Sequence, residues 1–327
     1  MKAIICGKYG PPDVLKVVEV PKPVPADHEL LIRIRATTVS SADWRVRSLV
    51  VPRGFGLLMR PVFGFRAPRQ PILGTELAGD VMAVGEAVTS FKVGDPVFAF
   101  PGGRMGCHAE YRCMPANGAV AIKPSTLSYQ QAAALSFGGF TMLDFFRRGN
   151  LRKGERVLVN GASGTVGTAA VQLAKHAGAH VTGVCSAANL ELVRSIGADR
   201  AIDYACKDFT RQGETYDVIV DTAGTAPFAR SGAALANGGR LLLVNASLAD
   251  LLAAPWQSLT SGKRVVAGPA DERVEYVHEL AELAASGAFR PVIDRTYPLE
   301  RIVDAHRHVD QGRKKGSVVV VLPADGD

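Results

Sequence analysis

The sequence has few of the features that would place it outside the ordinary globular enzymes. Its five cysteines are an odd number without metal-type spacing, which argues against a disulfide framework and favours reduced thiols in a cytoplasmic protein. No stretch of about 18 uninterrupted apolar residues occurs, so we expect no stable membrane insertion. There is no basic tail and no recognisable nucleic-acid module, and a net charge of +7 spread over 327 residues does not predict nucleic-acid binding.

What the sequence does contain is a first part rich in short β-type runs. Residues 1 to about 122 alternate such runs with proline and glycine punctuation, which is typical of a barrel-like all-β module. An insert at residues 51–69 interrupts it and mixes phenylalanine, leucine and methionine with arginine and proline, without strand or helix period. Two readings of the insert stay open. It is either a surface loop without function, or a segment whose apolar side chains contact substrate and whose arginines meet a carboxylate or a membrane surface.

From about residue 123 to 267 the pattern changes to strands alternating with helices. Strands are expected at 156–160, 180–185, 200–203, 217–221, 239–245 and 264–267, and the clearest helices at 165–176 and 190–196. Such alternation predicts a parallel, doubly wound sheet covered on both faces. After residue 268 we expect a helix over 271–287, a second over 299–311 and a last strand over 317–322.

The most informative stretch follows the strand at 156–160. Gly161, Gly164 and Gly167 form a GxxGxxG pattern between that strand and the next helix. In a dinucleotide site the first glycine permits the tight turn, the second lets the backbone approach a pyrophosphate, and the third lets the helix pack on the sheet. The helix N-terminus offers unpaired N–H groups to the phosphates. Strand, turn and helix stand in the required order, which predicts a dinucleotide site.

The second strand of this unit lacks the acidic residue typical of NAD-preferring sites. It ends at Cys185 and Ser186, and the first acidic residue, Glu191, lies inside the next helix. Ser186 leaves room for a 2′-phosphate, and Asn189 could donate to the same group. We therefore predict NADPH rather than NADH. The basic partner of the phosphate is expected among Lys175, Arg194 and Arg200, or elsewhere in the fold.

Several long segments carry a family resemblance. They include "PILGTELAGDVMAVGEAVTSFKVGDPVFAF" (71–100), "NGASGTVGTAAVQLAK" (160–175) and "RPVIDRTYPLERIVDAHRHVDQGRKKGSVVVV" (290–321). The chain resembles the zinc-independent medium-chain dehydrogenase/reductases, in particular the quinone oxidoreductase and enone reductase group. The resemblance implies an α/β protein in which a GroES-like β-rich catalytic domain (1–122 and 268–327) is split by a Rossmann NADP(H)-binding domain (123–267). It also implies a homodimer.

The same resemblance bears on metal binding. Where zinc-dependent members carry their ligands, this chain has Ser40, Thr75 and Phe137, which leaves only Glu76. A catalytic zinc site needs about three protein ligands, so we expect no metal. A zinc-type alcohol dehydrogenase is accordingly the disfavoured alternative. A protein that binds NADPH without turnover is the other.

Without a metal, the reaction that the resemblance implies is hydride transfer from NADPH to a quinone or an α,β-unsaturated carbonyl compound. Ser40, Asp43 and Arg45 are the catalytic candidates, although the family usually has asparagine in place of Ser40 and often tyrosine in place of Arg45. Two alternatives stay open: Asp43 could instead fix this turn through backbone hydrogen bonds, and Arg45 could be a solvated surface charge. The expected cofactor-binding residues are Thr141, Gly161, Ser163, Gly164, Thr165, Val166, Gly167, Ser186, Asn189, Tyr204, Ala223, Gly224, Asn245 and Lys314.

Overall fold

The computed structural model describes residues 1–323 and divides them into two compact units. Unit 1 comprises Met1–Val51, Gly56–Phe137 and the chain from Glu272 onward. Unit 2 comprises Pro52–Phe55 and Gly138–Asp271. Among residues 1–323, no helix has both the length and the hydropathy that crossing a bilayer requires.

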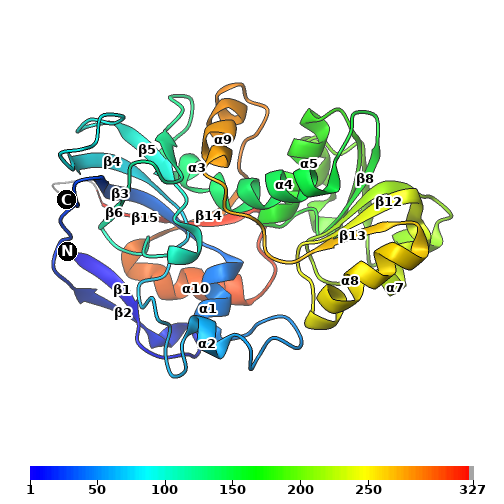
Figure 1. Ribbon diagram of the computed structural model, residues 1–327, viewed down its shortest axis with the longest axis horizontal. Helices are drawn as coiled ribbons and strands as arrows, with labels where there is room; N and C mark the ends of the chain where they lie inside the picture. Colours follow the sequence, from blue (N-terminus) through cyan, green and yellow to red (C-terminus); the bar gives the residue numbers. More distant parts are fainter. Residues whose placement is uncertain (324–327) are drawn as a thin grey trace. The chain divides into compact units, whose positions relative to one another are not determined.

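Unit 1 is built around a seven-stranded mixed sheet (Figure 1). Its centre is β3, eleven residues long and buried along most of its length, which pairs antiparallel with β4, β6 and β15. The strands of this sheet are β3 (Glu29–Val39), β4 (Leu77–Val84), β5 (Pro96–Ala99), β6 (Tyr111–Pro115), β7 (Val120–Ile122), β14 (Ile293–Pro298) and β15 (Ser317–Val321). A separate antiparallel pair is formed by β1 (Lys2–Cys6) and β2 (Leu15–Glu19).

The helices of unit 1 are short and come from both ends of the chain. They are α1 (Ser41–Ser48), α2 (Arg60–Phe63), α3 (Tyr129–Ala133), α9 (Glu275–Ala285) and α10 (Ile302–Asp310). α10 packs on β14 and β15, and α3 packs on β3 and β4. Because α3 lies on these strands, residues 123–137 belong to unit 1, about fifteen residues beyond the point where the sequence changes character.

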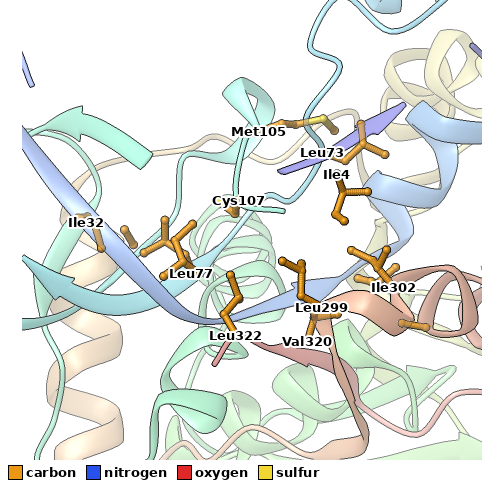
Figure 2. Packing of buried hydrophobic residues seen from close by; sticks show 14 of the residues in the cluster. Ile4, Ile32, Leu73, Leu77, Met105, Cys107, Leu299, Ile302, Val320 and Leu322 are labelled. Atoms are coloured by element: carbon orange, nitrogen blue, oxygen red, sulfur yellow. The ribbon is translucent and has the colours of Figure 1, made fainter. Parts of the chain in front are cut away.

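The core of unit 1 joins residues that are far apart in the sequence. Figure 2 shows Leu299 and Ile302, from the start of the C-terminal helical segment, beside Val320 of β15 and near Ile4 of β1. Each of these four side chains is at most 1% exposed. The C-terminal segment therefore completes the same hydrophobic core that the N-terminal strands begin.

Unit 2 contains a six-stranded, fully parallel sheet with the order β10-β9-β8-β11-β12-β13. Numbered within the unit, this is the order 3-2-1-4-5-6 of the doubly wound dinucleotide-binding fold, with its switch point between β8 and β11. The strands are β8 (Arg156–Asn160), β9 (His180–Cys185), β10 (Arg200–Asp203), β11 (Tyr216–Asp221), β12 (Leu235–Leu243) and β13 (Arg264–Ala267). The Rossmann expectation is confirmed.

Helices flank this sheet, as its buried strands require. They are α4 (Ser136–Gly149), which begins at the boundary between the units, α5 (Thr165–His176), α6 (Leu190–Ser195), α7 (Phe228–Ser231) and α8 (Leu248–Ser261). Short 3₁₀ turns lie at Pro12–Val14, Gly102–Arg104, Ala187–Asn189, Phe209–Arg211, Gly232–Ala234 and Leu299–Arg301. β8 is buried on both faces except at Arg156, and β11 except at the half-buried Asp217, which is typical of parallel strands covered by helices.

Candidate active site

The turn after β8 is fixed by hydrogen bonds to the neighbouring strand. The backbone N–H groups of Gly161 and Ala162 both donate to the carbonyl oxygen of Val184, at 3.0 and 2.9 Å. Gly161 has φ +83°, a left-handed conformation that glycine adopts without strain. Gly164 is the extended N-cap residue, and α5 starts at Thr165. The first turn of α5 therefore presents its N–H groups at the carboxyl edge of the sheet.

Gly164 and Gly167 differ in whether a Cβ atom would fit at their positions. A Cβ atom on Gly167 would lie 2.1 Å from the carbonyl oxygen of Gly161, so only glycine lets the helix approach the turn. A Cβ on Gly164 would meet nothing closer than that same oxygen at 3.7 Å, and its φ of −78° suits any residue. Internal packing does not explain glycine at position 164. The close approach of a pyrophosphate does, and the turn thus fits a dinucleotide.

The switch point of the sheet is organised by a buried polar pair. Asn160, the last residue of β8, donates from Nδ2 to Oδ1 of Asp221 and to Oγ1 of Thr225, both at 2.9 Å. Asp221 is 1% exposed and also accepts the backbone N–H groups of Ala223, Gly224 and Ala226. This network fixes the turn after β11. The residue-by-residue prediction did not include Asn160 or Asp221, although a polar residue at the end of each apolar strand was a visible signal.

Three predicted cofactor residues meet beside that turn. Ala223 and Gly224 form it, and Gly224 has φ +73°. A Cβ on Gly224 would lie 2.7 Å from Nδ2 of Asn245, so the amide of Asn245 lies directly against the turn. Thr141 is half-buried on α4. These positions are compatible with the roles predicted for them, which stay predictions.

The end of β9 gathers the residues predicted for the adenosine phosphate. Nδ2 of Asn189 donates to Oγ of Ser163 at 3.0 Å, which joins this region to the glycine turn. The Oδ1 atom of Asn189 is buried and has no partner in the described part of the chain. Ser186 is half-buried at the start of the turn that holds Asn189. Tyr204 is 63% exposed, and its backbone N–H donates to the carbonyl of Cys185.

The three candidate basic residues differ in their surroundings. Lys175 pairs with Asp199 at 2.5 Å, and Arg200 pairs with Glu214 at 2.5 Å. Arg194 is exposed and makes no ion pair with any residue of the described chain. Burial raises the pKa of Cys185 to about 11, and the charge of Arg194 opposes that rise, which places the guanidinium within electrostatic reach of the end of β9. Arg194 is therefore the best placed of the three to meet a phosphate there.

In unit 1, Ser40 and Asp43 form a capping box at the start of α1. Oγ of Ser40 accepts the backbone N–H groups of Ala42 and Asp43, and Oδ2 of Asp43 accepts from the backbone N–H and the hydroxyl of Ser40, both at 2.7 Å. Oδ1 of Asp43 accepts the backbone N–H of Gly74 at 2.7 Å. Both side chains thus position α1 against the loop of Gly74. Arg45, one turn later, is half-buried, and that burial lowers its pKa.

Glu76 is a buried carboxyl group that the list of predicted site residues omitted. It is 1% exposed; Oε1 accepts from Oγ1 of Thr38 at 2.5 Å, and Oε2 accepts from the backbone N–H of Phe137 at 2.6 Å. Burial raises its pKa to about 7, although both hydrogen bonds oppose the rise. A carboxyl with this pKa exchanges its proton in the neutral range. The sequence did contain a signal for it, because Glu76 is the one residue kept at the positions where zinc-dependent relatives carry their metal ligands.

Lys314, one of the residues predicted to bind the cofactor, lies in unit 1. Its Nζ donates to the carbonyl oxygen of Gly316 at 2.7 Å. Burial lowers its pKa to about 8, and the charges of Asp294 and Glu76 oppose that change. Lys314 therefore shares an electrostatic environment with Glu76. Its contact with a phosphate stays a prediction.

The donor set around Glu76 does not fit a catalytic zinc ion. Both carboxylate oxygens of Glu76 already accept hydrogen bonds, and the hydroxyl of Ser40 is engaged with Asp43. Thr75 has only a hydroxyl to offer. Within residues 1–323, no three histidine, cysteine, aspartate or glutamate side chains converge on one point. These residues therefore do not form a zinc site.

Comparison with known proteins assigns the chain to a family. Residues 26–124 match the alcohol dehydrogenase GroES-like domain, and residues 196–320 match a domain described as zinc-binding dehydrogenase. The chain is 32% identical to the chloroplastic quinone-oxidoreductase homolog of Spinacia oleracea over 329 residues, which cover 96% of each protein. It belongs to the quinone oxidoreductase group of the medium-chain dehydrogenase/reductases.

Other quinone oxidoreductases support the assignment. The enzyme of Sus scrofa is 32% identical over 98% of each chain. The solved quinone oxidoreductase of Coxiella burnetii superposes with a TM-score of 0.86 over 99% of each chain, at 27% identity. A mycobacterial protein solved in complex with NADPH has a TM-score of 0.81 at 27% identity. The expected fold, GroES-like and Rossmann, is confirmed, and this member of the quinone oxidoreductase group is an NAD(P)H-dependent oxidoreductase.

Proposed function

We propose that the protein reduces a quinone or an α,β-unsaturated carbonyl compound with NADPH and without a metal. The observation that carries the proposal is the turn after β8. No packing contact requires glycine at position 164, whereas the close approach of a bound dinucleotide does. The choice of acceptor is supported by relatives named quinone oxidoreductase in spinach and pig and by a tomato relative named 2-methylene-furan-3-one reductase, 30% identical over 98% of this chain.

The preference for NADPH is supported by what lies at the end of β9. Ser186 stands where an NAD-preferring site carries an acidic residue. The carboxylate of the neighbouring strand, Asp203, accepts hydrogen bonds from the backbone of Ala205 and the thiol of Cys206. Arg194 then supplies the positive charge that a 2′-phosphate requires.

The bound NADPH would supply the hydride, and the residues of the chain would bind the cofactor, attract the acceptor and hold an exchangeable proton. The N–H groups at the start of α5 hold the pyrophosphate, and the turn of Ala223 and Gly224 with Asn245 limits where the cofactor lies at the sheet edge. The half-buried guanidinium of Arg45 is suited to attract an acceptor oxygen that gains negative charge. Glu76, with a pKa of about 7, holds an exchangeable proton at its carboxyl oxygens within unit 1.

The test is steady-state oxidation of NADPH by the chelator-treated protein with a quinone panel and an enone panel, and with NADH as the control cofactor. Turnover with NADPH well above that with NADH is expected. Binding of NADPH without turnover on either panel would contradict the catalytic part of the proposal and support a binding role.

A matched pair of variants tests the cofactor site itself. Gly164→Ala should fold normally, because its Cβ meets nothing closer than 3.7 Å, but bind NADPH at least about tenfold more weakly, or 1.4 kcal/mol. Gly167→Ala should lower the melting temperature, because its Cβ would clash with backbone at 2.1 Å. Unchanged NADPH affinity in a folded Gly164→Ala protein would remove the main support for the site.

We also propose that the protein is a homodimer and that it is cytoplasmic. On α8, Leu252, Trp256 and Leu259 are 72%, 68% and 85% exposed, and their spacing places them on one helix face that a second copy could cover. Trp256→Glu should then yield monomers by light scattering, whereas Val24→Glu, at a valine that is 85% exposed in unit 1, should not; a dimeric Trp256→Glu protein would contradict this interface. The five free cysteines suit a reducing compartment.

A further inference from the structure

The insert at residues 51–69 carries charge of one sign only. From Val51 to Thr75 the chain contains four arginines and no aspartate or glutamate. Three of them, Arg60, Arg66 and Arg69, lie in unit 1 and are exposed. No carboxylate of this segment is available to neutralise them.

The part of the insert in unit 1 is an ordered structure rather than a free loop. It contains α2, whose last residue, Phe63, packs against the core of unit 1. The backbone N–H of Arg69 donates to the carbonyl of Phe63 at 2.7 Å, and the hydroxyl of Tyr9 donates to the carbonyl of Gly64 at 2.7 Å. Gly64 has φ +124°, and a Cβ there would lie 2.0 Å from the carbonyl oxygen of Ala67. The loop after α2 is thus tightly folded, and Tyr9, from the segment that follows β1, holds it in place.

Phe63 packs against the core, but four other large apolar side chains of this segment are exposed. Leu57 is 85% exposed, Leu58 55%, Val62 59% and Phe65 66%. Isolated exposed apolar residues are common, but four within nine positions of the sequence form an unusual concentration. No other part of the described chain covers these four side chains.

The arginines lie close to these apolar side chains. Nη1 of Arg60 donates to the carbonyl oxygen of Phe65 at 2.7 Å, which holds its guanidinium at the backbone of an exposed apolar residue. Burial raises the pKa of the Tyr9 hydroxyl, and the charges of Arg60 and Arg69 both oppose that rise, so both guanidiniums are within electrostatic reach of the same atom. The insert therefore combines exposed apolar side chains with a local cluster of positive charge.

We propose that this insert surface, formed by Leu57, Leu58, Arg60, Val62, Phe65, Arg66 and Arg69, binds the surface of membranes that contain anionic phospholipids. Apolar side chains of this kind enter the boundary between headgroups and acyl chains, while arginines pair with phosphate groups. Segments with both features bind in proportion to apolar area and to attraction by anionic lipid. The insert surface shares no residue with the nucleotide turn, and the inference does not depend on the proposed reaction.

The charge pattern favours a membrane over a protein partner or a second copy. A second copy would bring another set of like-charged arginines to the same surface, with no acidic residue of the insert to meet them. An anionic bilayer presents phosphates at any position and so needs no matched arrangement of partners. It also accommodates both leucines and the phenylalanine without a preformed pocket.

The experiment is cosedimentation of the full-length protein with sucrose-loaded vesicles, either of phosphatidylcholine alone or of phosphatidylcholine with about one third phosphatidylglycerol. We expect binding to the anionic vesicles, at least about tenfold weaker binding to neutral ones, and release by about 0.5 M salt, because salt screens the attraction. The double variant Arg66→Glu/Arg69→Glu should weaken binding by at least about 25-fold, because loss of each arginine charge costs about fivefold and each glutamate adds repulsion. Phe65→Ser should weaken it without changing the dependence on salt.

Matched controls are Val24→Ser and Arg104→Glu, which alter an exposed valine and an exposed arginine elsewhere in unit 1. They should bind vesicles like the unaltered protein, and every variant should keep its melting temperature and its affinity for NADPH. Equal binding to neutral and anionic vesicles, or unchanged binding of the charge-reversal variant, would overturn the proposal. So would an effect of Phe65→Ser confined to self-association or to the Michaelis constant for quinones.

Discussion

Replacing Glu76 with glutamine should change how the stability of unit 1 depends on pH. Burial raises the pKa of this carboxyl from 4.5 to about 7. The folded state therefore keeps a proton that the unfolded state has lost, so the free energy of unfolding falls as pH rises through this range. At 1.36 kcal/mol for each unit, the full loss is about 3 kcal/mol, complete only above the folded pKa and absent below about pH 4.5.

The glutamine variant removes this dependence because an amide does not titrate. It also leaves either Thr38 or the N–H of Phe137 without an acceptor, but that penalty does not vary with pH. The difference in unfolding free energy between the two proteins should therefore move by about 3 kcal/mol in favour of Glu76→Gln between about pH 4.5 and pH 8.

Urea unfolding at a series of pH values measures this difference. In a Trp256→Phe background the remaining tryptophan, Trp44, lies in unit 1 and reports on that unit alone. Glu86→Gln, at an exposed glutamate of the same unit, is the control and should give a flat difference. A flat difference for Glu76→Gln as well would refute the reasoning, since it would mean that Glu76 ionises as freely in the folded protein as in the unfolded chain.

Three further outcomes are expected. Arg194→Ala should weaken NADPH binding by about tenfold and leave NADH binding unchanged in calorimetric titrations, whereas Lys175→Ala, whose lysine pairs with Asp199, should affect neither; equal losses for both cofactors would contradict the phosphate assignment. Arg47→Met should lower the free energy of unfolding by about 3–5 kcal/mol in urea, because the fully buried guanidinium binds Asp310, His306 and the carbonyl of Gly10. Dialysis against EDTA should leave the rate of NADPH oxidation unchanged, since the residues near Glu76 do not form a zinc site; loss of activity restored by zinc would contradict that.

The sheet of unit 2 could be read from the sequence almost residue for residue. The expected strands at 156–160, 180–185, 200–203 and 264–267 and the helix at 165–176 are confirmed at both ends. Strands buried on both faces appear as uninterrupted apolar runs, and the glycines fix where the first one stops. The elements that the sequence did not reveal are those whose pattern is irregular. α8 contains Pro255 within its length and carries an exposed apolar face, so its periodicity resembles neither a core helix nor a surface helix.

The polar network of unit 1 was harder to predict for a different reason. Resemblance to a known family points to Ser40, Asp43 and Glu76 as site positions. It does not identify the groups that hydrogen-bond to their side chains. Asp43 receives the backbone N–H of Gly74, and Glu76 receives that of Phe137, 61 residues away. Contacts with backbone groups distant in the chain leave no trace in residue type. Only the folded chain shows that Asp43 also holds the loop of Gly74, and that Glu76 is left with a raised pKa.

The arrangement of the sheets has a consequence for synthesis on the ribosome. Every strand of unit 2 lies between residues 156 and 267, so that unit has all its strands once this stretch has emerged. Unit 1 cannot be complete until much later, because β15, at residues 317–321, pairs with β3, at residues 29–39. Until β15 emerges, β3 therefore lacks a strand partner along residues 36–39 of one edge, because β6 pairs only with residues 29–33, and the core beside that end stays open. Stop codons or slow codons just before residue 317 should consequently produce aggregation of a chain whose nucleotide-binding half is already folded.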